Sequence, residues 1–182
     1  MTPDKEATQL AELAALLEGG SAPVTGERIA LQGLELLPEA EWASLTIRHK
    51  GSYATLGASS PIAAELDESQ YKLGEGPCVE AYQEAEWFRS GDVAHDPRWR
   101  VWGPHAAATG ASSVLSIRML SQGKPIGAMN YYSPHPSAFG DRDVIDHAVL
   151  FATHAAIALT SARKVEQLET AVSSRHAIGM AQ

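Results

Sequence analysis

Residues 43–56 read ASLTIRHKGSYATL. Leu45 and Ile47 alternate with polar neighbours, a pattern typical of a β-strand that buries one face. Lys50-Gly51 predicts a tight turn, and residues 52–56 return as a second strand. This stretch therefore predicts an antiparallel hairpin.

A second hairpin is expected further along the chain, with strands at 113–120 and 125–132 joined by Gln122-Gly123. A short strand is expected at 86–93. Helices are expected at 4–18, at 26–37, after Pro61, from Cys78 to Glu84, from an Asp96 cap to Ala108, and from Phe139 almost to the end. This order predicts an α+β fold, with an antiparallel sheet of five to six strands, flanking helices and a long C-terminal helix.

Composition excludes several classes of protein. The chain has 182 residues, of which 45% are hydrophobic and 20% charged, so one globular core is expected. The first ten residues are polar, and no apolar stretch is long enough for a membrane span. With a single cysteine, Cys78, a disulfide framework is excluded and a cytoplasmic location is expected. The net charge of −8 argues against nucleic acid or an anionic membrane as a partner of the whole chain.

Several segments together resemble a GAF domain, a small sensory module, over residues 23–161. The segments that carry the resemblance are ASLTI at 43–47, LGEGPC at 73–78, DVAHDPRW at 92–99, residues 112–119, GAMNYYS at 127–133 and residues 139–159. No single segment is specific, but their order and spacing are. The resemblance implies a GAF-like sheet and a small-molecule effector whose identity the sequence does not reveal.

The tail resembles the beginning of an ANTAR domain, an RNA-binding unit of three helices. The resemblance rests on residues 167–182, QLETAVSSRHAIGMAQ, and implies RNA-binding roles for Arg175 and His176. We therefore divide the chain into an N-terminal helix (1–22), a GAF domain (23–161) and a linker with the start of an ANTAR unit (162–182). Because the family pattern continues for two more helices, RNA binding is expected only when that unit is complete.

The resemblance implies a transcription antitermination regulator in which the GAF domain gates the RNA-binding unit. Under this hypothesis the chain is not an enzyme. A small-molecule redox enzyme on a GAF scaffold is the alternative.

The candidate ligand-binding residues are aromatic side chains, a histidine and the cysteine. Trp99, Trp102 and His105 share a helix face, and aromatic rings with a polar neighbour suit a small-molecule cleft. Packing in the core is the alternative interpretation of these rings. The set of candidates is Cys78, Trp87, Trp99, Trp102 and His105.

The sequence favours no catalytic, metal or cofactor site. Cys78 near a helix start could form a thiolate, but burial as a small apolar residue is the favoured interpretation. Asp92, His95 and Asp96 are expected to end a strand and cap a helix rather than to bind a metal. His147 and His154 lie on one helix face, yet nothing pairs them with a haem pocket.

The last helix carries a heptad-like row, which predicts a homodimer through this helix, the first helix, or both. The alternative is a helix that packs only on its own domain. The row consists of Val144, His147, Phe151, His154, Ala158, Ser161, Val165, Leu168, Val172 and Arg175.

Overall fold

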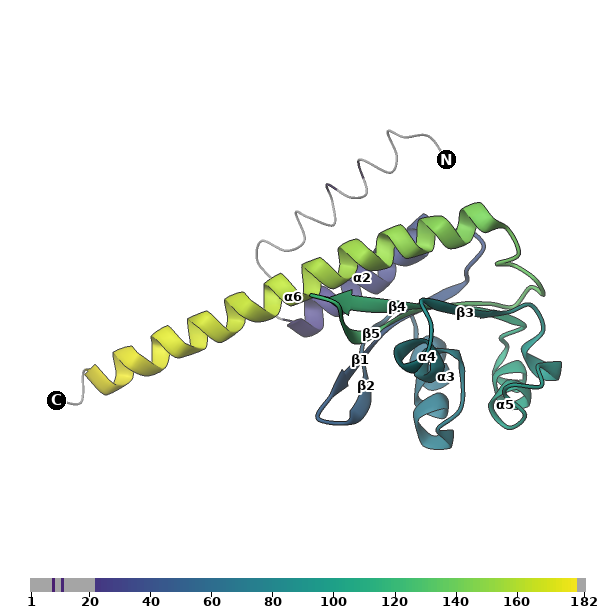
Figure 1. The fold of residues 1–182 in the computed structure, drawn as a ribbon, viewed down its shortest axis with the longest axis horizontal. Coiled ribbons are helices and arrows are strands. Elements are labelled where there is room, and N and C mark those ends of the chain that lie inside the picture. Colours follow the sequence, from purple (N-terminus) through teal and green to yellow (C-terminus); the bar gives the residue numbers. More distant parts are fainter. Residues whose placement is uncertain (1–7, 9–10, 12–21, 180–182) are drawn as a thin grey trace.

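The computed structural model describes residues 22–179, together with residues 8 and 11. Its centre is one antiparallel sheet of five strands in the order β2-β1-β5-β4-β3 (Figure 1). The strands are β1 (Trp42–His49), β2 (Ser52–Ala58), β3 (Trp87–Ser90), β4 (Ser113–Ser121) and β5 (Lys124–Ser133). The expected helix at 4–18 lies outside the described residues, except for Thr8 and Ala11.

Both expected hairpins are present, and both turn through two residues with positive φ. Lys50 and Gly51 have φ of 49° and 86°, and Gln122 and Gly123 have φ of 51° and 75°. Turns of this left-handed type match the twist of the strands that they join. The hairpins β1–β2 and β4–β5 then pair through β1 and β5, so that β5 lies in the middle of the sheet.

Helices cover both faces of the sheet, as Figure 1 shows. On one face lie α2 (Ala22–Leu36) and the long α6 (Arg142–Gly179). On the other lie α3 (Pro61–Leu73), α4 (Pro77–Gln83), the short η2 (Val93–His95) and α5 (Trp102–Thr109). The α+β prediction with a long C-terminal helix is confirmed.

Alternation along the central strands gives the two faces different chemistry. The face under α2 and α6 is apolar, with Leu45 and Ile47 on β1 and Met129 on β5 all in one buried cluster. The face under α3 and α4 carries buried polar side chains, including Ser44 and Asn130. One helix layer therefore stabilises the sheet by apolar burial, whereas the other covers a polar interior.

Two expected elements are shorter than the sequence indicates. The strand expected at 86–93 ends at Ser90, and the helix expected after Asp96 begins only at Trp102. The Glu75 side chain explains the later start, because its Oε1 accepts hydrogen bonds from the backbone N–H groups of Val101 (2.9 Å) and Trp102 (3.0 Å). A carboxylate at this position satisfies donors that the first helical turn leaves free.

Part of the heptad-like row of α6 packs on its own domain. Phe151 and Ala158 are 3% and 1% exposed and belong to the cluster against the sheet. Within residues 142–164, an 18-residue window has a mean hydropathy of 1.4, which by length and composition would suit a membrane span, but 44% of that window is buried inside the domain. The apolar composition of this segment thus reflects packing on the sheet.

Phe151→Ala should lower the free energy of unfolding by about 3–5 kcal/mol, because it removes a large buried ring and leaves a cavity. Val101→Ala, at a side chain that is 58% exposed, should change it by no more than about 0.5 kcal/mol. Urea denaturation of both variants measures the difference. Equal effects would contradict the assignment of Phe151 to the domain core.

Candidate functional site

The most unusual group on the polar face is the carboxylate of Asp67, in the middle of α3, which is fully buried. Its Oδ1 accepts hydrogen bonds from three side chains of the central strands. Ser44 Oγ lies at 2.8 Å, Asn130 Nδ2 at 3.1 Å and Tyr132 OH at 2.6 Å. One carboxylate oxygen thus joins α3 to β1 and β5.

The second oxygen, Oδ2, is held by hydroxyl groups from β1, β2 and α3. Thr46 Oγ1 donates at 3.3 Å, Thr55 Oγ1 at 3.0 Å and Tyr71 OH at 3.4 Å. All six donors are neutral. We call these seven residues the Asp67 cluster: Ser44, Thr46, Thr55, Asp67, Tyr71, Asn130 and Tyr132.

No cationic side chain compensates the charge of Asp67 within the described residues, whose ion pairs all lie elsewhere. Burial raises the pKa of Asp67 above its ordinary value of 3.8, although the hydrogen bonds from Tyr132, Ser44, Thr55 and Thr46 oppose the shift. Desolvation disfavours the charged form, and neutral donors recover part of that cost. The cluster is therefore polar, buried and short of positive charge.

Two buried oxygens on the polar face of the sheet have no hydrogen-bond partner. They are Asn130 Oδ1 and Ser116 Oγ, on residues that pair directly across β5 and β4. Both residues are 0% exposed. Since a buried polar atom normally has a partner, these two oxygens mark a place where the polar interior is incomplete.

Gln70 connects the cluster to Cys78 and the start of α4. Its Nε2 donates to Tyr132 OH at 2.8 Å, and its Oε1 accepts from the backbone N–H of Cys78 at 2.9 Å. The close approach requires Gly76, because a Cβ there would lie 2.4 Å from Gln70 Oε1. Burial, reinforced by the charge of Asp67, raises the pKa of the Cys78 thiol well above its ordinary value.

Three tyrosines form the outer wall of the site. The Tyr71 ring stacks on Tyr53 with centroids 5.7 Å apart, and Tyr53 meets Tyr82 edge-on at 5.7 Å. The guanidinium of Arg48 lies over Tyr53 (5.4 Å) and Tyr82 (5.1 Å). A path of aromatic rings therefore leads from the buried carboxylate to an exposed arginine.

The structure does not gather the five predicted ligand residues into one pocket. Trp99 and Trp102 are fully buried, with ring centroids 5.7 Å apart. Trp87 packs with the cluster on the opposite face of the sheet. His105 is exposed at a pocket between α3 and α5. Cys78 adjoins the Asp67 cluster through Gln70, and Trp99 and Trp102 pack in one hydrophobic cluster with Tyr132.

Each buried tryptophan satisfies its ring N–H. Trp99 Nε1 donates to Glu80 Oε1 at 2.8 Å, and Trp102 Nε1 donates to Ser69 Oγ at 2.9 Å. These bonds suit a core role for both rings, and a ligand role for them stays a prediction. The predicted RNA-binding residues Arg175 and His176 belong to the last part of α6, whose side chains lie outside the described residues.

The residues between β3 and α5 bind one another. His95 Nδ1 lies 2.8 Å from Asp92 Oδ2 in an exposed pair, while Asp96 pairs with Arg98. The Arg98 hydrogen bonds lower the pKa of Asp96 to about 2. Within the described residues, no three acidic, histidine or cysteine side chains converge on one point.

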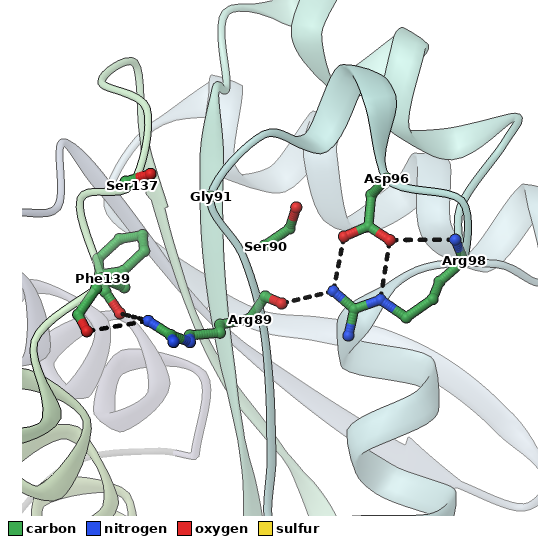
Figure 2. Close-up of a pocket in the computed structure, with 8 residues that line it drawn as sticks. Arg89, Ser90, Gly91, Asp96, Arg98, Ser137 and Phe139 are labelled. Carbon is green, nitrogen blue, oxygen red and sulfur yellow. Dashed lines mark hydrogen bonds and ion pairs between the residues drawn. The ribbon is translucent and has the colours of Figure 1, made fainter.

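A surface pocket of about 290 Å³ lies at the end of β3. Figure 2 shows two of its arginines, Arg89 and Arg98, on opposite sides of the strand. Arg89 Nη1 donates to the carbonyl oxygens of Phe139 (2.9 Å) and Gly140 (3.1 Å), just before α6. Arg98 Nη2 donates to Asp96 and to the carbonyl of Arg89 (2.6 Å). Because both arginines donate hydrogen bonds to the protein itself, the residues of this pocket hold β3 against the start of α6 and the loop before α5. We call this set of contacts the arginine joint.

The main residues of the site are absent from the sequence prediction. A signal for them exists: Ser44, Thr46, Ser116 and Asn130 occupy alternate positions of strands whose other positions are apolar. Alternation alone assigns such residues to a solvated face. The helices that cover this face convert the same pattern into a buried polar site.

Asp67→Asn should become more stable relative to the wild type as the pH rises. A carboxyl group with a raised pKa in the folded state contributes stability below its unfolded pKa, near 3.8, and loses it as the pH rises through the folded pKa. Urea titrations of both proteins between about pH 3 and pH 8 measure this difference. A wild-type advantage that grows with pH would contradict it.

Cys78 should be unreactive and dispensable for folding. Its thiol is 0% exposed and has a raised pKa, so alkylation should be at least about tenfold slower in the native protein than in urea. Cys78→Ala should keep a cooperative melting curve, while Cys78→Ser should cost about 1–3 kcal/mol if its hydroxyl is left unpaired. Equal alkylation rates in the native and unfolded protein would show that the thiol is accessible.

Solved structures share this fold at low sequence identity. The GAF domain of an Acinetobacter phosphoenolpyruvate-protein phosphotransferase is 14% identical, with 91% of this chain and 98% of that chain covered and a TM-score of 0.67. The corresponding GAF domain from Coxiella burnetii is 18% identical, with 89% and 96% covered and a TM-score of 0.67. Free methionine-R-sulfoxide reductase from Neisseria meningitidis, solved with its substrate, is 17% identical, with 91% and 96% covered and a TM-score of 0.67.

The expectation that the chain is not an enzyme needs correction. Free methionine-R-sulfoxide reductases from Neisseria meningitidis and Thermoplasma acidophilum have this fold, so the fold does not separate sensors from catalysts. At 17% and 18% identity these likenesses concern the fold alone. The sequence argument against catalysis therefore does not stand.

A search of curated proteins finds no match. The family model described as "GAF domain" matches residues 25–160, close to the 23–161 expected from the sequence. That match covers most of the chain and agrees with the five-stranded sheet and its two helix layers. The chain therefore belongs to the GAF domain family.

Proposed function

We propose that this GAF domain is a sensor whose small-molecule effector binds at the Asp67 cluster. The observation that carries the proposal is a buried carboxylate without a cationic partner, together with two buried oxygens on the same face of the sheet without hydrogen-bond partners. Such groups are costly for stability alone. A ligand that binds them would recover that cost, and so would favour the conformation that holds it.

Strand β5 supplies a route from this site to α6. Asn130 and Tyr132 bind Asp67 on one face, while Met129 and Tyr131 pack in the cluster that contains α6 on the other. A displacement of β5 by the effector would thus move the surface on which α6 rests. Arg89 ties β3 to the residues just before α6 and adds a second connection.

We further propose that α6 passes this change to an RNA-binding antitermination unit. Support comes from the resemblance of residues 167–182 to an ANTAR domain and from the continuous helix between Arg142 and Gly179. The tail from 162 to 182 has three basic and two acidic residues, unlike the acidic body. Arg175 and His176 are its proposed RNA contacts.

Native mass spectrometry of the purified chain tests the effector site. A small molecule should be retained by the wild type and by Asp146→Asn, an exposed carboxylate on α6, but lost from Asp67→Asn. Retention by Asp67→Asn would contradict the proposed site. Reduction of free methionine-R-sulfoxide by the purified chain would instead favour the redox-enzyme alternative.

A homodimer remains part of this proposal, but the structure changes the expected contact surface. Phe151 and Ala158 face their own sheet. Among the side chains that the structure describes, the large apolar residues exposed on these helices are Leu31 on α2 and Leu150 and Ile157 on α6, which are 42%, 42% and 58% exposed. Leu150 and Ile157 lie seven residues apart and so share one helix face. This face is the proposed dimer surface.

Ile157→Glu should convert the protein from dimer to monomer at tens of micromolar, because it places a charge in the proposed apolar contact. Lys72→Glu, which is also an exposed site but on α3, should stay dimeric. Sedimentation velocity measures both. A wild type that sediments only as a monomer would exclude this dimer.

The RNA step is tested by joining the tail to two further helices of an ANTAR unit. The extended protein should bind a dual-hairpin RNA at about 150 mM salt, and Arg175→Ala should weaken binding about tenfold. The 182-residue chain should bind much more weakly, because no aromatic residue follows Phe151 on which a base could stack. Binding that is unaffected by Arg175→Ala would contradict the assignment.

A further inference from the structure

Resting on the proposed effector site, we propose that the effector carries a planar nitrogen cation, a guanidinium or amidinium group, which binds between Asp67 and the tyrosines at the outer wall. Three features of the site favour this class over neutral and anionic ligands. They are its charge, its unpartnered oxygens and the aromatic wall.

The carboxyl group at the centre of the site has no cationic partner among the described residues. Asp67 is fully buried and receives hydrogen bonds only from neutral hydroxyl and amide groups. Hydrogen bonds between a charged donor and a carboxylate are about twice as strong as neutral ones. A planar cation can also offer two parallel N–H groups to a carboxylate, which a hydroxyl cannot do.

The unpartnered oxygens require donors as well. Asn130 Oδ1 can only accept, and Ser116 Oγ can accept while its own proton turns elsewhere. Asn130 Nδ2 already lies 3.1 Å from Asp67 Oδ1, so the amide that carries the free oxygen adjoins the carboxylate. A ligand rich in N–H groups would satisfy both, whereas a carboxylate or phosphate would bring only further acceptors.

The aromatic wall already holds a group of the proposed class. The guanidinium of Arg48, an exposed side chain, rests over Tyr53 and Tyr82, and no carboxylate pairs with it among the described residues. Tyr71 stacks on Tyr53 and reaches Asp67 with its hydroxyl. A free guanidinium that displaces Arg48 from these rings would keep the same cation–π contacts.

The test uses the full chain and three small probes at equal ionic strength. They are methylguanidinium, its neutral counterpart methylurea, and acetate. Titrations followed by amide chemical shifts should place methylguanidinium at the Asp67 cluster, with an affinity about tenfold higher than that of methylurea. Acetate should not perturb the cluster.

Variants of the protein distinguish the effect of the Asp67 charge on ligand preference from the effect of side-chain size. Asp67→Asn keeps the size of the side chain and should reduce the preference for methylguanidinium over methylurea to about threefold or less. The matched control Asp146→Asn, on the exposed face of α6, should keep the full preference. Arg48→Ala, at an exposed position, should raise the affinity for methylguanidinium severalfold, because it frees the tyrosine rings.

Two results would overturn the inference in different ways. If methylurea or acetate binds at the cluster as tightly as methylguanidinium, the effector is not selected for a cationic group. The proposed effector site would still stand. If none of the three probes moves cluster resonances, the inference fails outright, and the native mass spectrometry of wild type and Asp67→Asn then decides the site independently. If Arg48→Ala binds methylguanidinium with the same affinity as the wild type, the tyrosine rings do not contribute to binding.

Discussion

The buried carboxylate of Asp67 joins α3 to three strands of the sheet. Its six hydrogen bonds come from β1, β2, β5 and α3, and Tyr132 extends the network through Gln70 to the start of α4. Each of these elements must be in place for the charge to be tolerated in the interior. Removing any one donor would leave a buried carboxylate poorly solvated, which is far more costly than the loss of an exposed hydrogen bond.

The two layers of the domain divide stability and function between them. The layer under α2 and α6 is mainly apolar, as expected of a scaffold, although the buried Tyr131 OH there also has no hydrogen-bond partner. The layer under α3 and α4 retains a raised pKa at Asp67 and two unpartnered oxygens, so its stability is lower than its burial alone would allow. Binding sites often contain such destabilising groups, because the bound ligand supplies the hydrogen bonds that the protein alone lacks.

The sequence allowed the scaffold to be predicted, but not the site. Lys50-Gly51 and Gln122-Gly123 determine the hairpins locally, and the long helix follows from an uninterrupted run after Phe139. Asp67 lies 63 positions from Asn130, so its burial depends on a contact that no local pattern reports. The start of α5 likewise depends on Glu75, 26 positions before Val101, and was therefore predicted too early.

The arginine joint at β3 has a consequence for how copies of this domain can meet. Strand β3 is one of the two border strands of the sheet, is only four residues long, and has its Arg89 carbonyl already bonded to Arg98. An incoming strand would have to break that bond before it could pair there, which protects this border from open-ended growth and aggregation. Association through helical surfaces avoids that obstacle, and it leaves the polar interior of each copy unchanged.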